Sequence, residues 1–452
     1  MHKIRSPKKY KTVKPNIKES ILQKSENQIK SPPAQFIQYS ENFSKNYEFF
    51  SNKIITKTSP NFQIKKQRRF SENDNLKPLL EETELSINIL KKEYDKYPIG
   101  EFSKGKIGLI KAFSYNSYHG LIKDENEDRI SVNSLIKKPH NFKNKIWPKI
   151  SYFSIFDGHG GETCSSFLKN TFLNYLIEDK NFPNDIKESL INTINKVEKE
   201  FNKKYVDIKN NNIDFSGSCA LILLIIENKI YIANVGDSRA IMSLENGKKY
   251  RSLTIDHKPN NPKEYERIIK IGGKIYIDQE EDIRDINKLK VINNESEFDK
   301  YFDEPNIIYR IYPCHLAVSR SIGDIKAKDT SFGGIHDEII STPDIYIIDI
   351  SSNFDFIIMG CDGIYDNLSN FDIIDSAWFT INHVAKERKY DINLISLDIC
   401  NMIIKNAMDK LSSDNLSVIV ITFEGLEKYL ANMKSKESKD KVLALNGDGK
   451  KK

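Results

Sequence analysis

The chain has 452 residues, of which 39% are hydrophobic and 29% are charged, and its formal net charge is +6. This hydrophobic share is low for one compact body of that length, but it is sufficient for a folded domain of roughly 250–330 residues with polar tails. The longest apolar run, Cys219–Ile226, is too short for a membrane span of about 20 residues. No apolar stretch follows the first charged residues, so we expect no secretory signal and an intracellular protein, in the cytoplasm, the nucleus or both.

The net charge is divided unevenly along the chain. Residues 1–70 hold 16 Lys and Arg against 4 Asp and Glu, a net charge of +12, which leaves −6 for residues 71–452. A nucleic-acid-binding surface needs cations gathered on one face, so the acidic body is not expected to bind nucleic acid. The basic tail is either a solvated disordered segment or an adaptor for an anionic surface or an acidic partner.

Composition predicts three regions. Residues 1–104 have isolated apolar side chains among Lys, Asn, Ser and Gln, and they are predicted to form a basic, largely disordered tail with one short helix over 79–94. Residues 105–424 are predicted to form the folded domain, in which the charged segment 278–305 is a surface insertion or flap. Residues 425–452 begin with a helical pattern and end as a polar tail.

Apolar runs and amphipathic patterns alternate in blocks along the folded domain. Three of the runs are short and separated by tight turns, which predicts an antiparallel meander over 218–226, 230–235 and 240–244. Strand blocks separated by helix blocks predict an α+β fold with antiparallel sheets under helices, and not a parallel βαβ sheet. The other predicted elements, in chain order, are helices over 162–177, 185–205 and 262–271, strands over 354–359 and 417–423, and a helix over 393–411.

Acidic residues gather at five places, next to apolar strands and beside Gly, Asn or Ser. Each place by itself is typical of a turn. Buried carboxylates that converge repel one another, however, and a fold tolerates them when cations lie between them. Oxygen ligands favour Mg²⁺ or Mn²⁺, and two such ions activate a water for in-line phosphoryl displacement. The five places are Glu127-Asp128, Asp157, Asp237, Asp362 with Asp366, and Asp414.

The five cysteines are widely spaced and include no Cys-x-x-Cys pair, so neither a disulfide framework nor a structural zinc site is expected. Cys219 and Cys361 lie within apolar runs and are predicted to be buried thiols of the core. Cys164 lies on a predicted helix and has no nucleophile motif around it.

The acidic segments occur together with other motifs in a fixed order. Over about residues 105–424, the chain resembles the metal-dependent serine/threonine protein phosphatases of type 2C, the PPM family. No single motif is specific, but their joint occurrence is. The matching motifs are Glu127-Asp128, Phe156-Asp157-Gly158-His159-Gly160-Gly161, Ser216-Gly217-Ser218-Cys219-Ala220, Asn234-Val235-Gly236-Asp237-Ser238-Arg239, Asp256-His257-Lys258-Pro259, Glu266-Arg267-Ile268 with Gly272-Gly273, Leu316-Ala317-Val318-Ser319-Arg320-Ser321-Ile322-Gly323-Asp324, Cys361-Asp362-Gly363-Ile364-Tyr365-Asp366 and Asp414-Asn415-Leu416-Ser417-Val418.

The resemblance implies two stacked antiparallel β-sheets flanked by helices, an α-β-β-α sandwich, with the site in a cleft at one edge. It implies two Mg²⁺ or Mn²⁺ ions and a weaker third, phosphoserine and phosphothreonine proteins as substrates, and a monomer. A metal-bridged hydroxide would attack phosphorus without a phosphoenzyme, and His159 would be the general acid. The implied metal positions are Asp157 as the bridge, the Gly158 carbonyl, Asp362 and Asp414 for the pair, Glu127 and Asp128 through bound waters, and Asp237 and Asp366 for the third ion.

The chain departs from the family pattern at two places. Lys123 stands four residues before the Glu-Asp pair, where the family usually has Arg. A lysine would contact the substrate phosphate as a point charge, whereas the guanidinium of an arginine forms two parallel hydrogen bonds to it. We therefore expect weaker phosphate binding, or another cation in that role. The stretch Tyr309–His315 replaces a shorter Arg-Val-x-Gly-type segment, and with the insertion before it we expect it to shape the choice of protein substrate.

Some interpretations stay open at this stage. His159 is either the catalytic acid or a turn histidine. His257 is expected to fix a loop by hydrogen bonds, and Asp324 to orient the flap or to support a site residue. The alternative function is a catalytically impaired pseudophosphatase that binds phosphoproteins, although a protein without metal chemistry has no need of mutually repelling aspartates.

Overall fold

A computed structural model of the chain describes residues 100–140, 142, 146–207, 210, 212–278, 290–292 and 307–448, with the backbone alone for 278, 290 and 440–448. The predicted tail up to residue 99 lies outside the described residues, and so does the helix predicted over 79–94. Most of the predicted insertion 278–305 lies outside them as well, namely 279–289 and 293–305.

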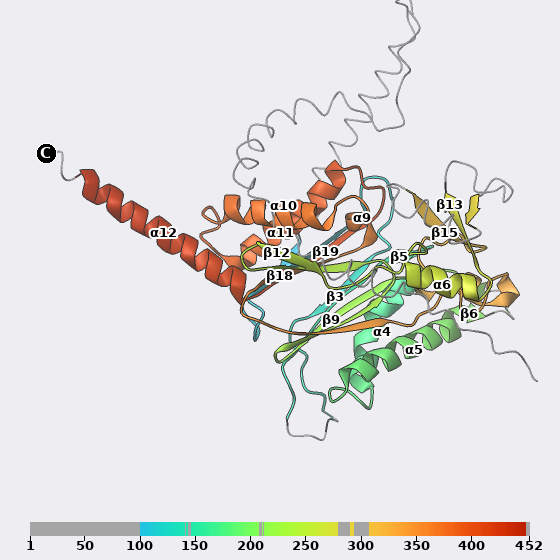
Figure 1. The fold of residues 1–452 in the computed structure, drawn as a ribbon. Coiled ribbons are helices and arrows are strands. Elements are labelled where there is room, and N and C mark those ends of the chain that lie inside the picture. The colour runs from blue at the N-terminus through green and yellow to red at the C-terminus, as the bar shows by residue number, and fades with distance from the viewer. Residues whose placement is uncertain are drawn as a thin grey trace, which may run out of the picture.

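Two antiparallel β-sheets stack face to face, which confirms the predicted α+β sandwich (Figure 1). All strand pairs in both sheets are antiparallel. One sheet has the order β1-β2-β19-β18-β11-β12, with bounds Glu101–Phe102, Ala112–Tyr118, Leu416–Thr422, Phe354–Gly360, Arg239–Leu244 and Lys249–Ser252. The other has the order β17-β10-β9-β4-β3, with bounds Asp344–Asp349, Lys229–Val235, Ala220–Ile226, Ile150–Phe156 and Arg129–Asn133.

Helices cover the outer face of each sheet (Figure 1). The first pair packs on the five-stranded sheet and consists of α4 (Thr163–Glu178) and α5 (Ile186–Tyr205). The second pair packs on the six-stranded sheet and consists of α10 (Asn370–Val384) and α11 (Ile392–Asp409). Side-chain caps begin several of these helices: Asp185, for example, accepts a hydrogen bond from the Glu188 amide ahead of α5.

Strand β9 explains why the sequence shows an unbroken apolar run at this point. Its odd-numbered residues, such as Leu221 and Leu223, belong to the core between the two sheets. Its even-numbered residues, such as Ile222 and Leu224, pack under α4 and α5. Successive side chains of a strand point to opposite faces, so a strand that is covered on both faces loses the usual alternation of polar and apolar residues.

The predicted three-stranded meander is wrong in its third strand. Strands β9 and β10 pair as expected, from Ile226 opposite Lys229 to Ala220 opposite Val235. Strand β11 pairs instead with β12 and β18 in the other sheet, while the second neighbour of β10 is β17. The Gly-Asp-Ser connection at 236–238 therefore crosses between the sheets and does not form a hairpin turn. A run of three short strands in sequence does not distinguish these two paths.

A third sheet, which we call the flap sheet, lies at one end of the sandwich (Figure 1). It consists of β14 (Lys290–Ile292), β13 (Lys274–Asp278) and β15 (Ile308–Tyr312), in that order. A separate apolar cluster joins it to the helices α6 (Pro262–Lys270) and α8 (Ile325–Lys328). The remaining short elements are β5 (Gly158–His159), β6 (Val206–Asp207), β7 (Asn212–Ile213), β8 (Gly217–Ser218), β16 (Ile322–Gly323), η3 (Thr330–Phe332) and α9 (Asp362–Tyr365).

The C-terminal segment differs from the predicted polar tail. It begins as a helix, as expected, but helix α12 continues from Glu424 to Asp448 and projects from the sandwich (Figure 1). Its first turns are anchored by Leu426 and Leu430, which are buried in the main core. None of the helices within the described residues combines the length and the apolar character that a membrane crossing requires.

Candidate active site

Four aspartates meet at one edge of the sandwich because each stands at the end of a core strand. Asp157 follows β4 and Asp237 follows β10. Both of these strands run antiparallel to β9, which lies between them, so their C-terminal ends reach the same edge. Asp362 follows β18 and Asp414 precedes β19. These two strands are antiparallel neighbours, and Gly360 at the end of β18 lies opposite Val418 near the start of β19.

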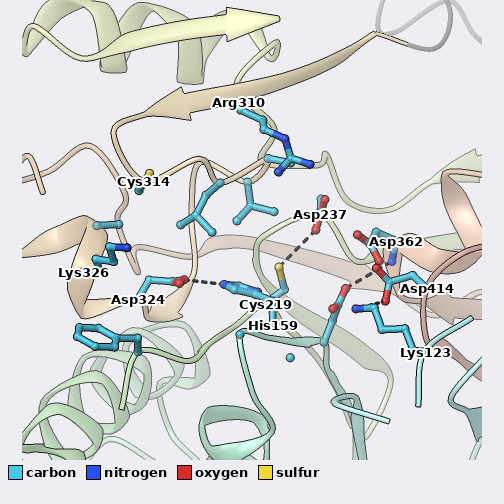
Figure 2. Close-up of a pocket in the computed structure, with 18 residues that line it drawn as sticks. Lys123, His159, Cys219, Asp237, Arg310, Cys314, Asp324, Lys326, Asp362 and Asp414 are labelled. Carbon is cyan, nitrogen blue, oxygen red and sulfur yellow. Dashed lines mark hydrogen bonds and ion pairs between the residues drawn. The ribbon is translucent and has the colours of Figure 1, made fainter. Parts of the chain in front are cut away.

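The four carboxylates line one cavity of about 390 Å³ (Figure 2). The sequence-predicted residues Lys123, Gly158 and His159 line it as well. Figure 2 shows Lys123 close to Asp414, and Arg310 reaching in from the flap sheet on the opposite side. The four aspartates thus form an acidic floor of the cavity. Its other lining residues include basic and apolar side chains, namely Phe215, Arg310, Cys314, Leu316, Ala317, Val318, Lys326 and Ala327.

Burial and mutual repulsion oppose ionisation of three of the floor aspartates, Asp157, Asp237 and Asp362. Burial raises the pKa of Asp157 well above its ordinary value, and the charges of Asp362, Asp128 and Asp237 raise it further. The pKa of Asp362 is raised well above its ordinary value for the same reasons. Burial also raises the pKa of Asp237, which Lys258 partly offsets. Divalent cations between these groups would remove the repulsion, and the carboxylate oxygens suit hard ions.

The three other predicted acidic residues surround the cavity without lining it. Asp128 is buried, its Oδ2 has no hydrogen-bond partner within the described part of the chain, and burial raises its pKa to about 6. Glu127 accepts a hydrogen bond from the Gly161 amide at 2.6 Å. Asp366 is exposed and accepts one from Lys258 Nζ at 2.6 Å. The orphaned oxygen of Asp128 fits a role toward a cation or its bound water.

Lys123 lies at the acidic end of the cavity. Its Nζ forms an ion pair with Asp414 Oδ1 at 2.7 Å and lies 3.6 Å from Glu127 Oε2. Burial lowers the pKa of Lys123, but the contact with Asp414 outweighs this effect, so the pKa ends above its ordinary value and the side chain keeps its charge. The structure thus provides a permanent cation next to the floor aspartates.

His159 is paired with a buried aspartate. Its Nε2 lies 2.8 Å from Asp324 Oδ2, and Ser321 Oγ donates to the same oxygen at 2.5 Å. Burial lowers the pKa of His159, yet the charge of Asp324 outweighs that and raises it, while the pKa of Asp324 is lowered by the histidine despite burial. The pair is closely packed against Gly217, where a Cβ would overlap both Asp324 Oδ2 and His159 Nε2.

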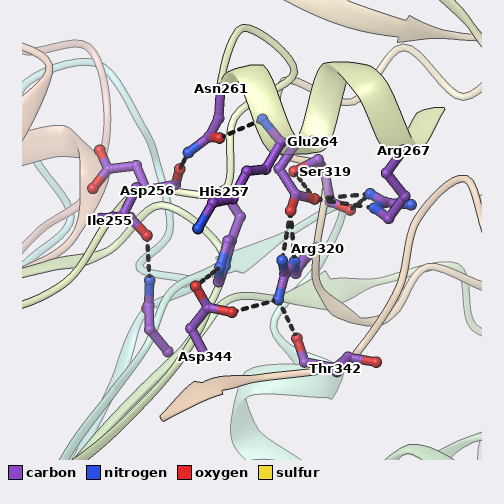
Figure 3. A network of polar contacts seen from close by, with 12 residues as sticks. Ile255, Asp256, His257, Asn261, Glu264, Arg267, Ser319, Arg320, Thr342 and Asp344 are labelled. Carbon is purple, nitrogen blue, oxygen red and sulfur yellow. Dashed lines mark hydrogen bonds and ion pairs between the residues drawn. The ribbon is translucent and has the colours of Figure 1, made fainter. Parts of the chain in front are cut away.

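A polar network holds the loop that follows β10 (Figure 3). His257 Nδ1 accepts a hydrogen bond from the Gly236 amide at 3.1 Å, and its Nε2 lies 3.5 Å from Asp344 Oδ2. Arg320 donates to Asp344 Oδ1 at 3.0 Å and to the buried Glu264 Oε1 at 3.1 Å. Because Gly236 precedes the floor aspartate of this loop, the network connects helix α6 of the flap region to the cavity. The expected loop-fixing role of His257 is confirmed.

Sequence reasoning missed part of the site. Asp324 was expected to orient the flap or to support a site residue, and in the structure it supports His159 by direct contact; its left-handed φ of 52° beside Gly323 is the local sign of a special turn. Cys219 is buried as predicted, but it also lines the cavity. No spacing rule would have found Arg310 or Lys326, because they reach the cavity through the packing of the flap sheet and α8.

Comparison with known proteins agrees with this geometry. The family described as "Protein phosphatase 2C" matches residues 123–416. "Probable protein phosphatase 2C 35" of Arabidopsis thaliana is 28% identical over 302 residues, which cover 64% of this chain and 80% of that protein. A structure titled as a C. elegans sex determining protein shares the fold with a TM-score of 0.52 at 17% identity, covering 82% of this chain and 79% of that one. A phosphatase structure from Toxoplasma gondii has a TM-score of 0.50 at 19% identity, covering 72% and 95%.

The matched segment contains all four floor aspartates, the His159–Asp324 pair, the whole five-stranded sheet and the strands β18, β11 and β12 of the six-stranded sheet. It also spans more than half of the chain. The chain belongs to the protein phosphatase 2C family and is a metal-dependent protein serine/threonine phosphatase.

Proposed function

We propose that the acidic cavity hydrolyses phosphoserine and phosphothreonine in proteins with the help of two Mg²⁺ or Mn²⁺ ions. The observation that carries the proposal is the convergence of Asp157, Asp237, Asp362 and Asp414 on one cavity, with raised pKa values for three of them. Repelling carboxylates cost stability, so their presence in one place is explained by a function that needs cations.

The donor set specifies how the ions would be held. Asp157, the Gly158 carbonyl, Asp362 and Asp414 are proposed ligands of the pair, and Asp237 with Asp366 of a weaker third ion. Glu127 and Asp128, which do not line the cavity, are proposed to act through bound waters, in keeping with the unpartnered Oδ2 of Asp128. When bound, the ions would activate water for attack and neutralise the charge that develops on the phosphoryl oxygens.

His159 is proposed to protonate the leaving oxygen of the serine or threonine. It lines the cavity, and its Nε2 is held by Asp324 Oδ2. The negative partner keeps the imidazole protonated to higher pH, which a proton donor requires. The proton passes from the ring to the alkoxide as the phosphorus–oxygen bond breaks, and solvent then restores it. Asp324 is a positioning residue in this scheme, since it acts through the histidine.

Lys123 is proposed to contact the substrate phosphate. Its ammonium group lies at the floor of the cavity but is already paired with Asp414 at 2.7 Å. A single charge shared in this way attracts the phosphate without fixing its orientation. We therefore expect weaker ground-state binding than an arginine at the same position would give.

The hydrolysis is proposed to be direct, without a phosphorylated enzyme. Two thiols line the cavity, but burial raises the pKa of Cys314 to about 12, and the Cys219 thiol donates to Asp237 Oδ1 at 3.3 Å. Protonated thiols are poor nucleophiles. Within the described residues, no serine or threonine lines the cavity, and Asp414 holds the Lys123 side chain as a charged ammonium, which leaves water as the proposed attacking group.

The test is hydrolysis of a phosphothreonine peptide and of an aryl phosphate by the full chain, with Mn²⁺, with Mg²⁺ and with a chelator. We expect activity that requires the ions and that Asp157→Asn lowers by roughly 10²–10³-fold. The matched control is Asp329→Asn, a partly exposed aspartate outside the cavity, which should retain activity. Phosphopeptide binding without any metal-dependent turnover would refute the proposal and support the pseudophosphatase alternative.

A further inference from the structure

Cys219 places a thiol among the floor aspartates. Its Sγ, one carboxylate oxygen of Asp157 and one of Asp237 all lie within 4.8 Å of one another. The thiol donates to Asp237 Oδ1 at 3.3 Å (Figure 2), and the backbone amide of Cys219 donates to the Asp157 carbonyl at 2.8 Å. Sulfur and oxygen donors from three separate strand ends therefore converge on one point of the cavity wall.

We propose that Asp157, Cys219 and Asp237 form a binding site for a thiophilic divalent cation, of which Zn²⁺ is the biological representative. This inference deepens the proposed function, on which it rests for the role of Asp157 and Asp237 as cation ligands. Magnesium and manganese prefer oxygen donors, so the cysteine adds nothing for them. A thiolate selects softer ions, so this sulfur makes the metal centre sensitive to zinc and cadmium.

The distances suit such an ion. Zinc–sulfur and zinc–oxygen bonds of about 2.3 and 2.0 Å place tetrahedral donor atoms roughly 3.3–3.5 Å apart. The 3.3 Å between Cys219 Sγ and Asp237 Oδ1 already meets this spacing. The remaining separations are all within 4.8 Å, and we expect the carboxylates to rotate toward the ion as it binds. On binding, the thiol releases its proton to solvent as the sulfur–metal bond forms.

A second observation points to a missing partner for the carboxylates. Asp157 is 9% exposed and lines the cavity. Within the described residues, its carboxylate accepts a single long hydrogen bond, from the Asp362 amide at 3.5 Å. A buried carboxylate that is otherwise unpaired destabilises the folded protein unless a cation or protons satisfy it. The side chain is thus available to an ion on the sulfur side as well as to the proposed catalytic pair.

The position of the sulfur is fixed by packing. Gly236 lies directly against the thiol with φ of 107°, and a Cβ at this position would overlap Cys219 Sγ and Cβ. Asp237 follows this glycine, so the backbone segment that packs against the thiol also carries one of the carboxylates. A thiophilic ion here would engage Asp157 and compete with the Mg²⁺ or Mn²⁺ that the same residue is proposed to hold. Zinc is therefore expected to inhibit the enzyme.

The test uses Cd²⁺ as the probe, because a cadmium–thiolate bond gives an ultraviolet charge-transfer band whether or not the enzyme turns over. The metal-free full-length protein is titrated with Cd²⁺, and we expect a band that saturates at one ion per chain. Cys219→Ser should remove the band, and Asp237→Asn, which keeps the thiol, should weaken Cd²⁺ binding at least about tenfold. Thermal unfolding of each variant checks that it is folded.

Cys314→Ser is the matched control. Cys314 also lines the cavity, but its thiol donates to the Ile311 carbonyl at 3.5 Å and contacts none of the floor carboxylates. The band should persist in this variant. Absence of the band in the folded wild-type protein, or its persistence in Cys219→Ser, would overturn the proposal.

A second measurement separates this inference from the proposed function. With Mn²⁺ supporting hydrolysis of a phosphopeptide, the Zn²⁺ concentration that halves the activity should rise at least about tenfold in Cys219→Ser, each variant being compared with its own uninhibited rate. Equal sensitivity to zinc in both would refute the sulfur ligand. A wild-type protein that shows the cadmium band but no Mn²⁺-dependent hydrolysis would refute the phosphatase mechanism and leave the cation site standing.

Discussion

The pairing of His159 with Asp324 makes the pH dependence of catalysis a direct test of the site. The change to make is Asp324→Asn. Asparagine tolerates the left-handed backbone at this position, where φ is 52°, and its amide oxygen can still accept from Ser321 and from the histidine ring. The substitution therefore removes the negative charge and little else.

The size of the effect on His159 follows from its hydrogen bond with Asp324. His159 Nε2 and Asp324 Oδ2 are 2.8 Å apart, and the aspartate is 5% exposed. A hydrogen bond to a charged group is worth roughly 1.5–3 kcal/mol, which at 1.36 kcal/mol per pH unit corresponds to about one to two pH units. Asp324 is what raises the pKa of His159, while burial lowers it. Without the charge, burial dominates and the pKa of the histidine falls.

The assay is kcat against pH for a phosphothreonine peptide in the presence of Mn²⁺. A proton donor must be protonated, so activity declines as pH rises through the pKa of His159, and this alkaline limb should move to lower pH by about one to two units in Asp324→Asn. His159→Gln should lose the limb, with a larger cost for the peptide than for an aryl phosphate, whose leaving group needs no proton. An unchanged limb in a folded Asp324→Asn protein would refute the reasoning.

Three further substitutions test other parts of the site. Gly217→Ala should separate the His159–Asp324 pair, because the added Cβ overlaps both side chains. We expect a lower kcat and a free energy of unfolding, measured in urea, that is lower by about 1–3 kcal/mol. Lys123→Arg should lower KM for a phosphopeptide with little change in kcat, because a guanidinium binds a phosphate through two parallel hydrogen bonds. Asp128→Asn should stabilise the metal-free protein at pH 7 by about 3 kcal/mol, since burial raises the pKa of Asp128 to about 6.

Each of these predictions has a control or an outcome that would contradict it. Gly105→Ala, at a glycine where an added Cβ would meet no atom within 4 Å, should leave both kcat and stability unchanged. An unaltered KM in Lys123→Arg would show that another cation anchors the phosphate. For Asp128, ionisation disfavours the folded state increasingly from about pH 4 to pH 6 and fully above that, so the stabilisation by Asn should vanish near pH 4. A less stable Asp128→Asn protein at pH 7 would contradict the reasoning.

The sequence by itself determined the local structure and the chemistry that the chain can perform. Helical spacing and turn residues placed α4, α5, α6 and α11 within a few residues of their observed bounds. The unbroken apolar run of β9 marked a strand covered on both faces. The aspartates beside glycine, taken with their order along the chain, identified the family before any contact was known.

Tertiary structure decided which of these pieces meet. Strand pairing depends on contacts between distant segments, so the sequence could not show that the chain leaves one sheet after β10 and enters the other at β11, nor that α12 continues to Asp448. That crossing carries Asp237 to the cavity, where its carboxylate accepts a hydrogen bond from the Cys219 thiol. The partner of His159 lies 165 residues away along the chain. Such a pair is created by packing alone, because no local pattern encodes a contact between two segments that lie so far apart along the chain.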